Sequence, residues 1–170
     1  AEFPAELFER TFARAHSAGL PCVPHSGENA GPESIWATLR LLHADRLGHG
    51  VRCAEDPALV DHLRQHQVPL EVCPTSNVRL GVYPDYAAHP LRRLGDAGLL
   101  VTVNSDDPPM FGTDLNREYE VLIDNFGFGA DELERVSLNA LQASFLAQAE
   151  KARLGAEFRA QFARLREELQ

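Results

Sequence analysis

The sequence predicts an α/β fold in which four parallel strands alternate with helices and further helices follow the last strand. Two observations lead to this prediction. Four short apolar runs begin about 20 to 30 residues apart, and segments with helical periodicity lie between them. Strands joined through helices in this way run parallel, with right-handed crossovers. We therefore expect a single domain over residues 1–170, without an internal boundary.

The four apolar runs are rich in β-forming residues and are predicted to be strands. They are residues 21–24, 46–51, 68–73 and 99–104. Their apolar residues are too continuous for strands that keep one face in water. Such runs are typical of parallel strands that are buried on both faces.

A segment with helical periodicity precedes each predicted strand. These segments are residues 6–18, 32–42, 57–65 and 90–97. The first segment places Leu7 and Phe12 on one face and ends before Gly19, a favourable residue after a helix end. The third segment begins after Asp56, a candidate N-cap, with proline at the first helical position. These signals predict the ends of the crossover helices.

The pattern after the last strand is helical. Asp131 and Glu134 have the spacing of a capping box beside a helix predicted over residues 133–146. A final amphipathic helix is marked by Leu154, Phe158, Phe162 and Leu165. Elsewhere, His89 precedes Pro90 and is predicted to cap a helix.

Composition and charge exclude several classes of protein. Of the 170 residues, 44% are hydrophobic and 24% are charged, which excludes a disordered chain. The net charge of −9 repels phosphate backbones and anionic lipids, and no run is apolar enough to span a membrane. The three cysteines lack metal-site spacing and are predicted to be reduced. We expect a cytoplasmic protein with no nucleic-acid or membrane partner, and its N-terminus lacks signal-peptide features.

Polar residues occur at the end of each predicted strand. The third strand ends in Cys-Pro-Thr-Ser-Asn at residues 73–77. The other three strands bring His25, Glu28, His49, Asp106 and Asp107. The carboxyl ends of parallel strands are where α/β proteins place their chemistry. Histidine and carboxylate groups that converge there are the ligands and acid/base groups that a metal-dependent hydrolase requires.

Each of these residues also has a structural interpretation. His25 can be a hydrogen-bonded histidine at a strand end, and the helix dipole favours Glu28 at a helix start. The glycines beside His49 can mark a bulge, or they can leave room for a ligand near the backbone. Asp106 and Asp107 can cap a helix or form a turn. Four strands would have to deliver these groups to one edge by coincidence, so the combination favours a site. Two adjacent carboxylates point in different directions, which suggests one metal ligand and one substrate ligand.

These residues lie in motifs that resemble those of the adenosine/adenine deaminase family of the amidohydrolase superfamily. The motifs are His-Ser-Gly-Glu at 25–28, Arg-Leu-Gly-His-Gly-Val-Arg at 46–52, Glu-Val-Cys-Pro-Thr-Ser-Asn at 71–77, His-Pro at 89–90 and Val-Thr-Val-Asn-Ser-Asp-Asp-Pro at 101–108. They follow the family's order and spacing up to about residue 119, and residues 137–146 look like its C-terminal helical region. The resemblance implies the C-terminal half of a (β/α)8 TIM barrel, four parallel βα units followed by C-terminal helices.

The resemblance also implies a reaction, the zinc-dependent hydrolytic deamination of a 6-aminopurine nucleoside to the 6-oxopurine and ammonia. Adenosine, or an adenosine-like compound, would be the substrate. His25 and Asp106 would bind Zn²⁺, which lowers the pKa of a bound water to about 7. Glu28 would protonate N1 of the purine, and Asp107 would hydrogen-bond N7. His49 would orient the water and take its proton.

The sequence departs from the family pattern at two points. Ser26 replaces the usual alanine, a change from one small residue to another. The His-x-His motif of the first barrel strand is absent, so the chain would supply two zinc ligands where a catalytic site usually has three. We therefore expect that the N-terminal strands are missing from this chain, and that the missing half or self-association covers the open sheet edges.

Alternative functions stay open beside this one. The chain could be a catalytically incomplete half barrel, a structural module that retains site residues. It could also be a deaminase specific for 6-aminodeoxyfutalosine or adenine, because the family's sugar-side specificity depends largely on N-terminal residues. A hydrolase of other substrates is disfavoured because Glu28 and Asp107 match N1 and N7 of one ring. Adenosine is the first substrate to test.

Overall fold

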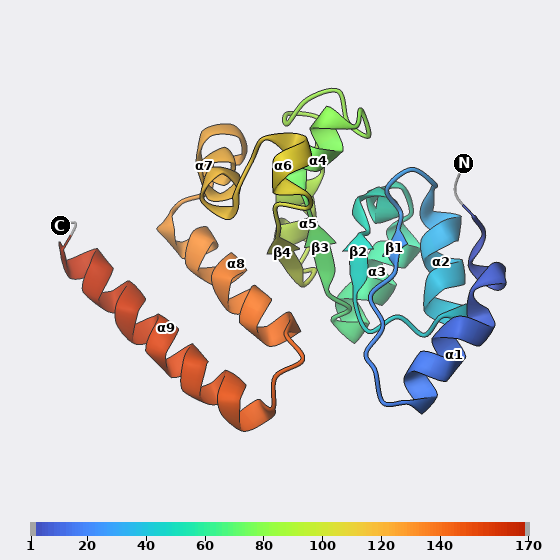
Figure 1. Ribbon diagram of the computed structural model, residues 1–170. Coiled ribbons are helices and arrows are strands. Elements are labelled where there is room, and N and C mark those ends of the chain that lie inside the picture. Colours follow the sequence, from blue (N-terminus) through green and yellow to red (C-terminus); the bar gives the residue numbers. More distant parts are fainter. Residues whose placement is uncertain (1–2, 169–170) are drawn as a thin grey trace.

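The computed structural model describes residues 3–168 and shows parallel strands that alternate with helices (Figure 1). The first half contains η1 (Ala5–Leu7), α1 (Glu9–Ser17), β1 (His25–Ser26), α2 (Pro32–Leu41), β2 (Leu47–His49), η2 (Val51–Glu55), α3 (Pro57–His66) and β3 (Leu70–Val72). The second half contains α4 (Pro74–Arg79), α5 (Leu91–Asp96), β4 (Val101–Val103), α6 (Pro108–Phe111), α7 (Leu115–Phe126), α8 (Ala130–Ala143) and α9 (Gln148–Glu168). The predicted alternation of four strands with crossover helices is confirmed, and α4 is an additional helix between β3 and β4.

The strands form one parallel sheet in the order β1-β2-β3-β4. Ser26 pairs with His49, Leu47 with Leu70, and Leu70 in turn with Val101. Because neighbouring strands are in parallel register, their carboxyl ends meet at one edge of the sheet. Within residues 3–168, β1 and β4 are the two outer strands and the sheet does not close into a barrel.

The first predicted strand is displaced. Residues 21–24 were expected to be the strand, but β1 is His25–Ser26. Pro21 and Pro24 have no backbone N–H to donate to a sheet, so this segment can use few of its ladder bonds. It accepts hydrogen bonds at the carbonyls of Cys22 and Pro24, both 2.9 Å from the donor nitrogen. His25 therefore lies in the strand rather than after it.

The start of α8 also differs from the prediction. The helix begins at Ala130, and the carboxylate of Glu132 accepts a hydrogen bond from the backbone N–H of Gly129 at 2.9 Å. Asp131 and Glu134, the predicted capping pair, instead both bind the Arg166 guanidinium of α9. Several acidic residues lie close together in this segment. Glu132, the third residue of the helix, is the one that forms the capping hydrogen bond.

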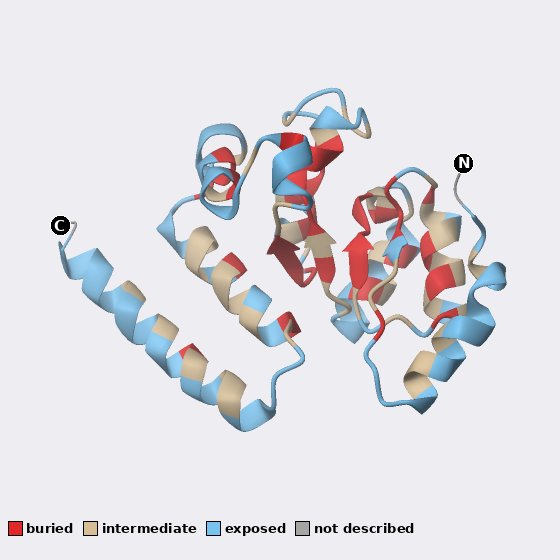
Figure 2. Cartoon of the chain, in the orientation of Figure 1, coloured by how far each residue is buried: buried red, intermediate tan, exposed pale blue. Residues whose placement is uncertain are grey.

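The core lies between the sheet and the helices that cross over it. Figure 2 shows that burial is concentrated in the strands and in the helix sides that face them, whereas α9 is mostly exposed. The fully buried apolar side chains include Ile35, Leu47, Leu59, Leu63, Leu70 and Val72. Asp56 caps α3 as predicted, accepting from the N–H of Ala58 at 2.9 Å. Over residues 3–168, no helix has the length and apolar character needed to cross a membrane.

Candidate functional site

The strand ends bring four of the predicted site residues together around His49. The rings of His25 and His49 meet edge to face with their centroids 4.7 Å apart. Nε2 of His49 lies 3.5 Å from Oε2 of Glu28 and 3.8 Å from Oδ2 of Asp106. His49 is almost completely buried, with 2% of its surface exposed, while His25 and Asp106 are reached by solvent. The predicted convergence of these groups is therefore present in the structure.

Gly48 makes the position of His25 possible. A Cβ atom added to Gly48 would lie 2.5 Å from Cδ2 of His25 and 3.2 Å from its Cα. The space beside the Gly48 backbone is thus filled by the imidazole of the neighbouring strand, not by a ligand. The absence of a side chain at Gly48 therefore makes room for a site residue, which differs from the close ligand approach that was one of two interpretations of the sequence.

The two adjacent aspartates point to different partners, as predicted. Oδ2 of Asp106 accepts a hydrogen bond from the hydroxyl of Ser76 at 2.6 Å and faces His49. Oδ1 of Asp107 accepts from the backbone N–H of Met110 at 3.2 Å and caps α6. The capping interpretation is therefore confirmed for Asp107, which does not join the cluster around His49. Only Asp106 of the pair lies among the candidate metal ligands.

Asn77 is a residue of this site that sequence reasoning missed. It is fully buried at 0% exposure, and its Nδ2 lies 3.4 Å from Oε1 of Glu28 and 3.3 Å from Nδ1 of His49. Residues 73–77 were expected to end a strand, but Pro74 begins the short helix α4, whose first turn is buried. Because this turn folds back toward the strand ends, it carries Ser76 and Asn77 to the carboxylates.

His89 has a second contact beyond its predicted capping role. Its Nδ1 accepts a hydrogen bond from the backbone N–H of Leu91, the first residue of α5, at 3.2 Å, although the N-cap residue itself is Pro90. Its Nε2 lies 3.1 Å from Oδ1 of Asn77. Burial lowers the pKa of His89 to about 4. Burial, with a contribution from neighbouring His25, also lowers the pKa of His49 to about 4, against an opposing effect of Asp106. Both rings are neutral at pH 7.

The side chains around His49 include the chemical groups that commonly bind zinc. His25, Glu28 and His49 have ligand atoms within 4.8 Å of one another, and so do His49, Cys73 and Asp106. Burial raises the pKa of the Cys73 thiol, with smaller effects from nearby carboxylates, so the thiol stays protonated and is a poor ligand. Without Cys73, the imidazoles of His25 and His49 and the carboxylates of Glu28 and Asp106 remain, and both groups are ordinary zinc ligands.

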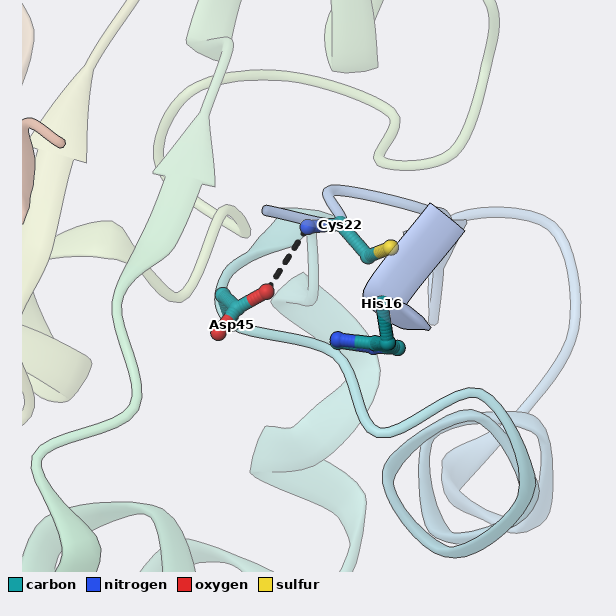
Figure 3. Close-up of side chains that lie close together, drawn as sticks. All are labelled: His16, Cys22 and Asp45. Atoms are coloured by element: carbon teal, nitrogen blue, oxygen red, sulfur yellow. Dashed lines mark hydrogen bonds between the residues drawn. The ribbon is translucent and has the colours of Figure 1, made fainter. Parts of the chain in front are cut away.

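A third group of possible ligands lies near the amino ends of the strands, away from this site. Figure 3 shows His16, Cys22 and Asp45 close together, with the backbone N–H of Cys22 donating to Oδ2 of Asp45 at 2.7 Å. Nε2 of His16 binds the carbonyl of Leu42 at 3.1 Å, and the Cys22 thiol donates to the carbonyl of Leu20 at 3.7 Å. Each group already has a protein partner, so the cluster is explained by its structural contacts.

The face of the sheet next to the site is hollow. A cavity of about 480 Å³ is lined by residues from all four strand ends, among them His25, His49, Glu71, Asp106 and Tyr119. Small-molecule sites in proteins have volumes of about 300 to 1,000 Å³. The site residues therefore border a space that can hold a compound of the size of a nucleobase.

The chain matches a known family and several curated proteins. The sequence profile described as Adenosine deaminase matches residues 1–160. An aminodeoxyfutalosine deaminase of Streptomyces avermitilis is 47% identical over 154 residues, which are 91% of this chain and 43% of that protein. An adenine deaminase of Agrobacterium fabrum is 48% identical over a region that covers 86% of this chain and 45% of the length of that protein. An adenosine deaminase of Klebsiella pneumoniae is 43% identical, with coverages of 89% and 46%.

Two solved structures share the fold. Adenine deaminase from Arthrobacter aurescens has a TM-score of 0.90 at 41% identity, over 92% of this chain and 48% of that chain. An amidohydrolase from Burkholderia ambifaria with bound Zn has a TM-score of 0.90 at 28% identity, over 98% of this chain and 47% of that one. The chain has the α/β fold of the C-terminal half of a TIM barrel, and it spans less than half the length of these relatives.

Proposed function

The chain belongs to the adenosine deaminase family, and from this premise we propose that it is part of a zinc-dependent enzyme that hydrolyses the 6-amino group of a purine. One observation carries the proposal. His25, Glu28, His49 and Asp106, from three strand ends, meet beside a cavity of about 480 Å³. These are a metal-binding pair and an acid/base pair, the groups that hydrolysis at an aromatic carbon requires.

His25 and Asp106 would hold the zinc ion. When bound, zinc lowers the pKa of a water molecule toward 7 and so provides a nucleophile at neutral pH. Ser76 donates to Oδ2 of Asp106 at 2.6 Å and fixes the orientation of that carboxylate. We place the third protein ligand outside these 170 residues, because the relatives are about twice as long as the region that this chain covers.

Glu28 is the acid of the proposed reaction. Attack of water at C6 breaks the aromaticity of the purine, and protonation of N1 lowers the cost of this step. Glu28 is 9% exposed, so bulk water has little access to the carboxyl group that carries the proton. Asn77 holds Oε1 of Glu28 at 3.4 Å. The other oxygen, Oε2, lies 3.5 Å from Nε2 of His49.

Asp107 would recognise N7 of the purine. N7 carries a lone pair, so a hydrogen bond from Asp107 to N7 requires a protonated carboxyl group. One oxygen of Asp107 caps α6, and a carboxyl group has two oxygens, so the cap and the contact to the substrate are compatible. In this proposal, Asp106 binds zinc and the adjacent Asp107 binds the purine.

Adenosine is the first substrate that we propose, with adenine and 6-aminodeoxyfutalosine as alternatives. Relatives named for each of these three deaminase activities are 43% to 48% identical to the chain, so identity does not choose among them. A panel of the three compounds, assayed by ammonia release with zinc-loaded protein completed by the N-terminal half of the barrel, tests the proposal. Release from one compound would identify the substrate. Absence of release from all three, with zinc bound, would favour a structural half barrel.

We also propose that the missing half of the barrel, or a second copy, covers the open edges of the sheet. A groove of about 910 Å³ lies beside β1, between the segment from Phe3 to Phe12 and α2. It is lined by Phe8 and Phe12 and by the site residues His25 and Glu28. A neighbouring barrel unit placed there would bury these apolar rings and enclose the site.

A further inference from the structure

The hydrogen bonds around Asn77 determine which nitrogen of His49 carries a proton. We infer that Asn77 and His89 are positioning residues that hold neutral His49 with its proton on Nε2, so that His49 meets the reacting groups as a hydrogen-bond donor. The identity of those reacting groups rests on the proposed function, whereas the proton position rests on the geometry of the network alone.

The network starts at a backbone amide, whose role is unambiguous. The N–H of Leu91 can only donate, and it lies 3.2 Å from Nδ1 of His89. That nitrogen therefore accepts and has no proton of its own. A neutral imidazole with an accepting Nδ1 carries its proton on Nε2. His89 is thus fixed as a donor at Nε2.

His89 in turn orients the Asn77 amide. Nε2–H of His89 points to Oδ1 of Asn77 at 3.1 Å, which places the amide oxygen on that side. The contact with Glu28 supports the same amide orientation, because Nδ2 of Asn77 lies 3.4 Å from Oε1 of the Glu28 carboxylate, which accepts. A flipped amide would set two donors against each other at His89 and two acceptors against each other at Glu28. The structure therefore allows one orientation of Asn77.

The second N–H of the Asn77 amide reaches His49. Nδ2 lies 3.3 Å from Nδ1 of His49, which must then accept and carry no proton. The proton of neutral His49 is consequently on Nε2, the nitrogen that faces Oε2 of Glu28 at 3.5 Å and Oδ2 of Asp106 at 3.8 Å. Asn77 is fully buried, and His49 and His89 are 2% and 4% exposed, so solvent does not compete for these bonds.

This proton position changes one role in the proposed reaction. Nε2 of His49 has no lone pair with which to take a proton, and the lone pair on Nδ1 is covered by Asn77. His49 then orients the oxygen of the nucleophile as a donor, and Glu28 carries the proton. The attacking water gives its hydroxyl to C6 and one proton, through the Glu28 carboxylate, to N1. The remaining hydroxyl proton then passes to the amino nitrogen, the C6–N bond breaks, and ammonia leaves the 6-oxopurine with its proton on N1.

Nitrogen NMR reads the proton position directly. In purified protein with ¹⁵N-labelled histidine at neutral pH, protonated and unprotonated ring nitrogens have distinct shifts and couplings. We expect His49 and His89 to show protonated Nε2 and unprotonated Nδ1, with the His49 signals assigned by their loss in His49→Gln. A protonated Nδ1 on His49 would overturn the inference. The experiment does not use activity, so a failed deamination assay leaves this result intact, and the reverse also holds.

Asn77→Asp tests whether Asn77 sets the proton position. An ionised aspartate only accepts, so it should draw the His49 proton to Nδ1 and exchange the two nitrogen signals. The matched control is Asn116→Asp, the same change at an exposed position of α7, which should leave both histidines unchanged. An unchanged His49 in a folded Asn77→Asp protein would refute the role of Asn77.

A second pair of variants avoids an added charge. His89→Gln retains a side-chain N–H that can donate to Oδ1 of Asn77, and it should keep the single Nε2–H form of His49. His89→Leu removes the donor that orients the amide, and it should give signals from both forms. His66, whose Nδ1 binds the carbonyl of His62 at 2.8 Å, serves as an internal reference in each spectrum. A single Nε2–H form of His49 in His89→Leu would contradict the role of His89.

Discussion

Two residues of the site, His49 and Asp106, hold left-handed backbone conformations, with φ of 61° and 57°. Such conformations cost about 1 to 3 kcal/mol each for residues other than glycine, and they cluster at functional sites. Histidine and aspartate tolerate this region better than most residues do. His49 is the last residue of β2 and Asp106 lies three residues after the end of β4, so both lie where the chain turns away from the sheet. The site is therefore built at some cost to stability.

Replacing Gly48 with alanine tests how the His25 ring is held. The new Cβ would lie 2.5 Å from Cδ2 of His25, so the ring must move away from its place beside His49. We expect zinc affinity to fall by about 10- to 100-fold, the usual effect of disturbing the groups that orient a ligand. Zinc titration by calorimetry measures this change. Gly95→Ala is the control, because no atom lies within 4 Å of its added Cβ. Equal affinity in the two variants would contradict the role given to Gly48.

In protein completed by the N-terminal half of the barrel, substitutions of Asp106 and Glu28 are expected to have different effects. Asp106→Ala should lose zinc, because a metal ligand is removed. Glu28→Gln should keep zinc and lose turnover by about 10² to 10⁴, the usual contribution of a general acid. Metal content by atomic absorption and ammonia release measured on the same samples separate the two effects. If Glu28→Gln retained most of the activity, Glu28 could not be the proton donor to N1.

Asp107→Asn separates substrate recognition from metal binding. Asparagine is a good N-cap, so the hydrogen bond that α6 makes to this side chain should persist. In the completed enzyme we expect KM to rise by about 2- to 10-fold, because an amide N–H is a weaker donor to the purine than a carboxyl O–H. Zinc stoichiometry should stay unchanged. Zinc loss as large as in Asp106→Ala would show that both carboxylates bind the metal.

At the scale of elements, the alternation of strands and helices was predictable because buried strands and crossover helices have strong apolar patterns. The convergence of His25, Glu28, His49 and Asp106 was predictable from parallel topology, which places strand ends together. The short helix α4 was not, because its sequence Pro-Thr-Ser-Asn-Val-Arg contains a single aliphatic side chain and therefore no apolar period. Its buried first turn is held by Glu118, which accepts from the N–H of Thr75 at 3.3 Å, a contact between distant segments.

The link between α4 and α5 through His89 should make stability depend on pH. The pKa of His89 is about 4 in the folded protein and 6.5 in a free imidazole. Between these values the unfolded chain binds the additional proton, so the free energy of unfolding falls as pH drops from 6.5 toward 4. The total effect is about 3 kcal/mol. Urea unfolding at pH 7 and pH 4.5 measures it. His89→Gln should show a smaller loss than the parent protein, and equal losses in the two proteins would exclude a contribution from His89.

At the scale of the whole molecule, the described sheet has two outer strands and exposed apolar side chains. Leu20, Phe145 and Leu146 are 58%, 49% and 45% exposed. Exposed sheet edges promote pairing with other chains. Arg46 reaches the carbonyl of Ala143 at 2.8 Å and stacks over the Phe145 ring at 4.1 Å, so the end of α8 is tied to the sheet although its apolar residues stay exposed. These edges and side chains are the surfaces that the proposed partner half would cover.

The 170 residues expressed alone should therefore not behave as a stable monomer. Open strand edges and uncovered apolar rings favour self-association or aggregation, and a site with two zinc ligands should hold the metal weakly. Sedimentation velocity of the 18.8 kDa chain, with bound zinc measured in the same fractions, tests both expectations. Species larger than a monomer, with zinc lost on dialysis, are expected. Addition of the N-terminal half of a family member should restore a defined complex and tight zinc binding if the missing ligands lie there. A monomeric chain with a sharp, reversible melt and one tightly held zinc would show instead that this half is complete by itself.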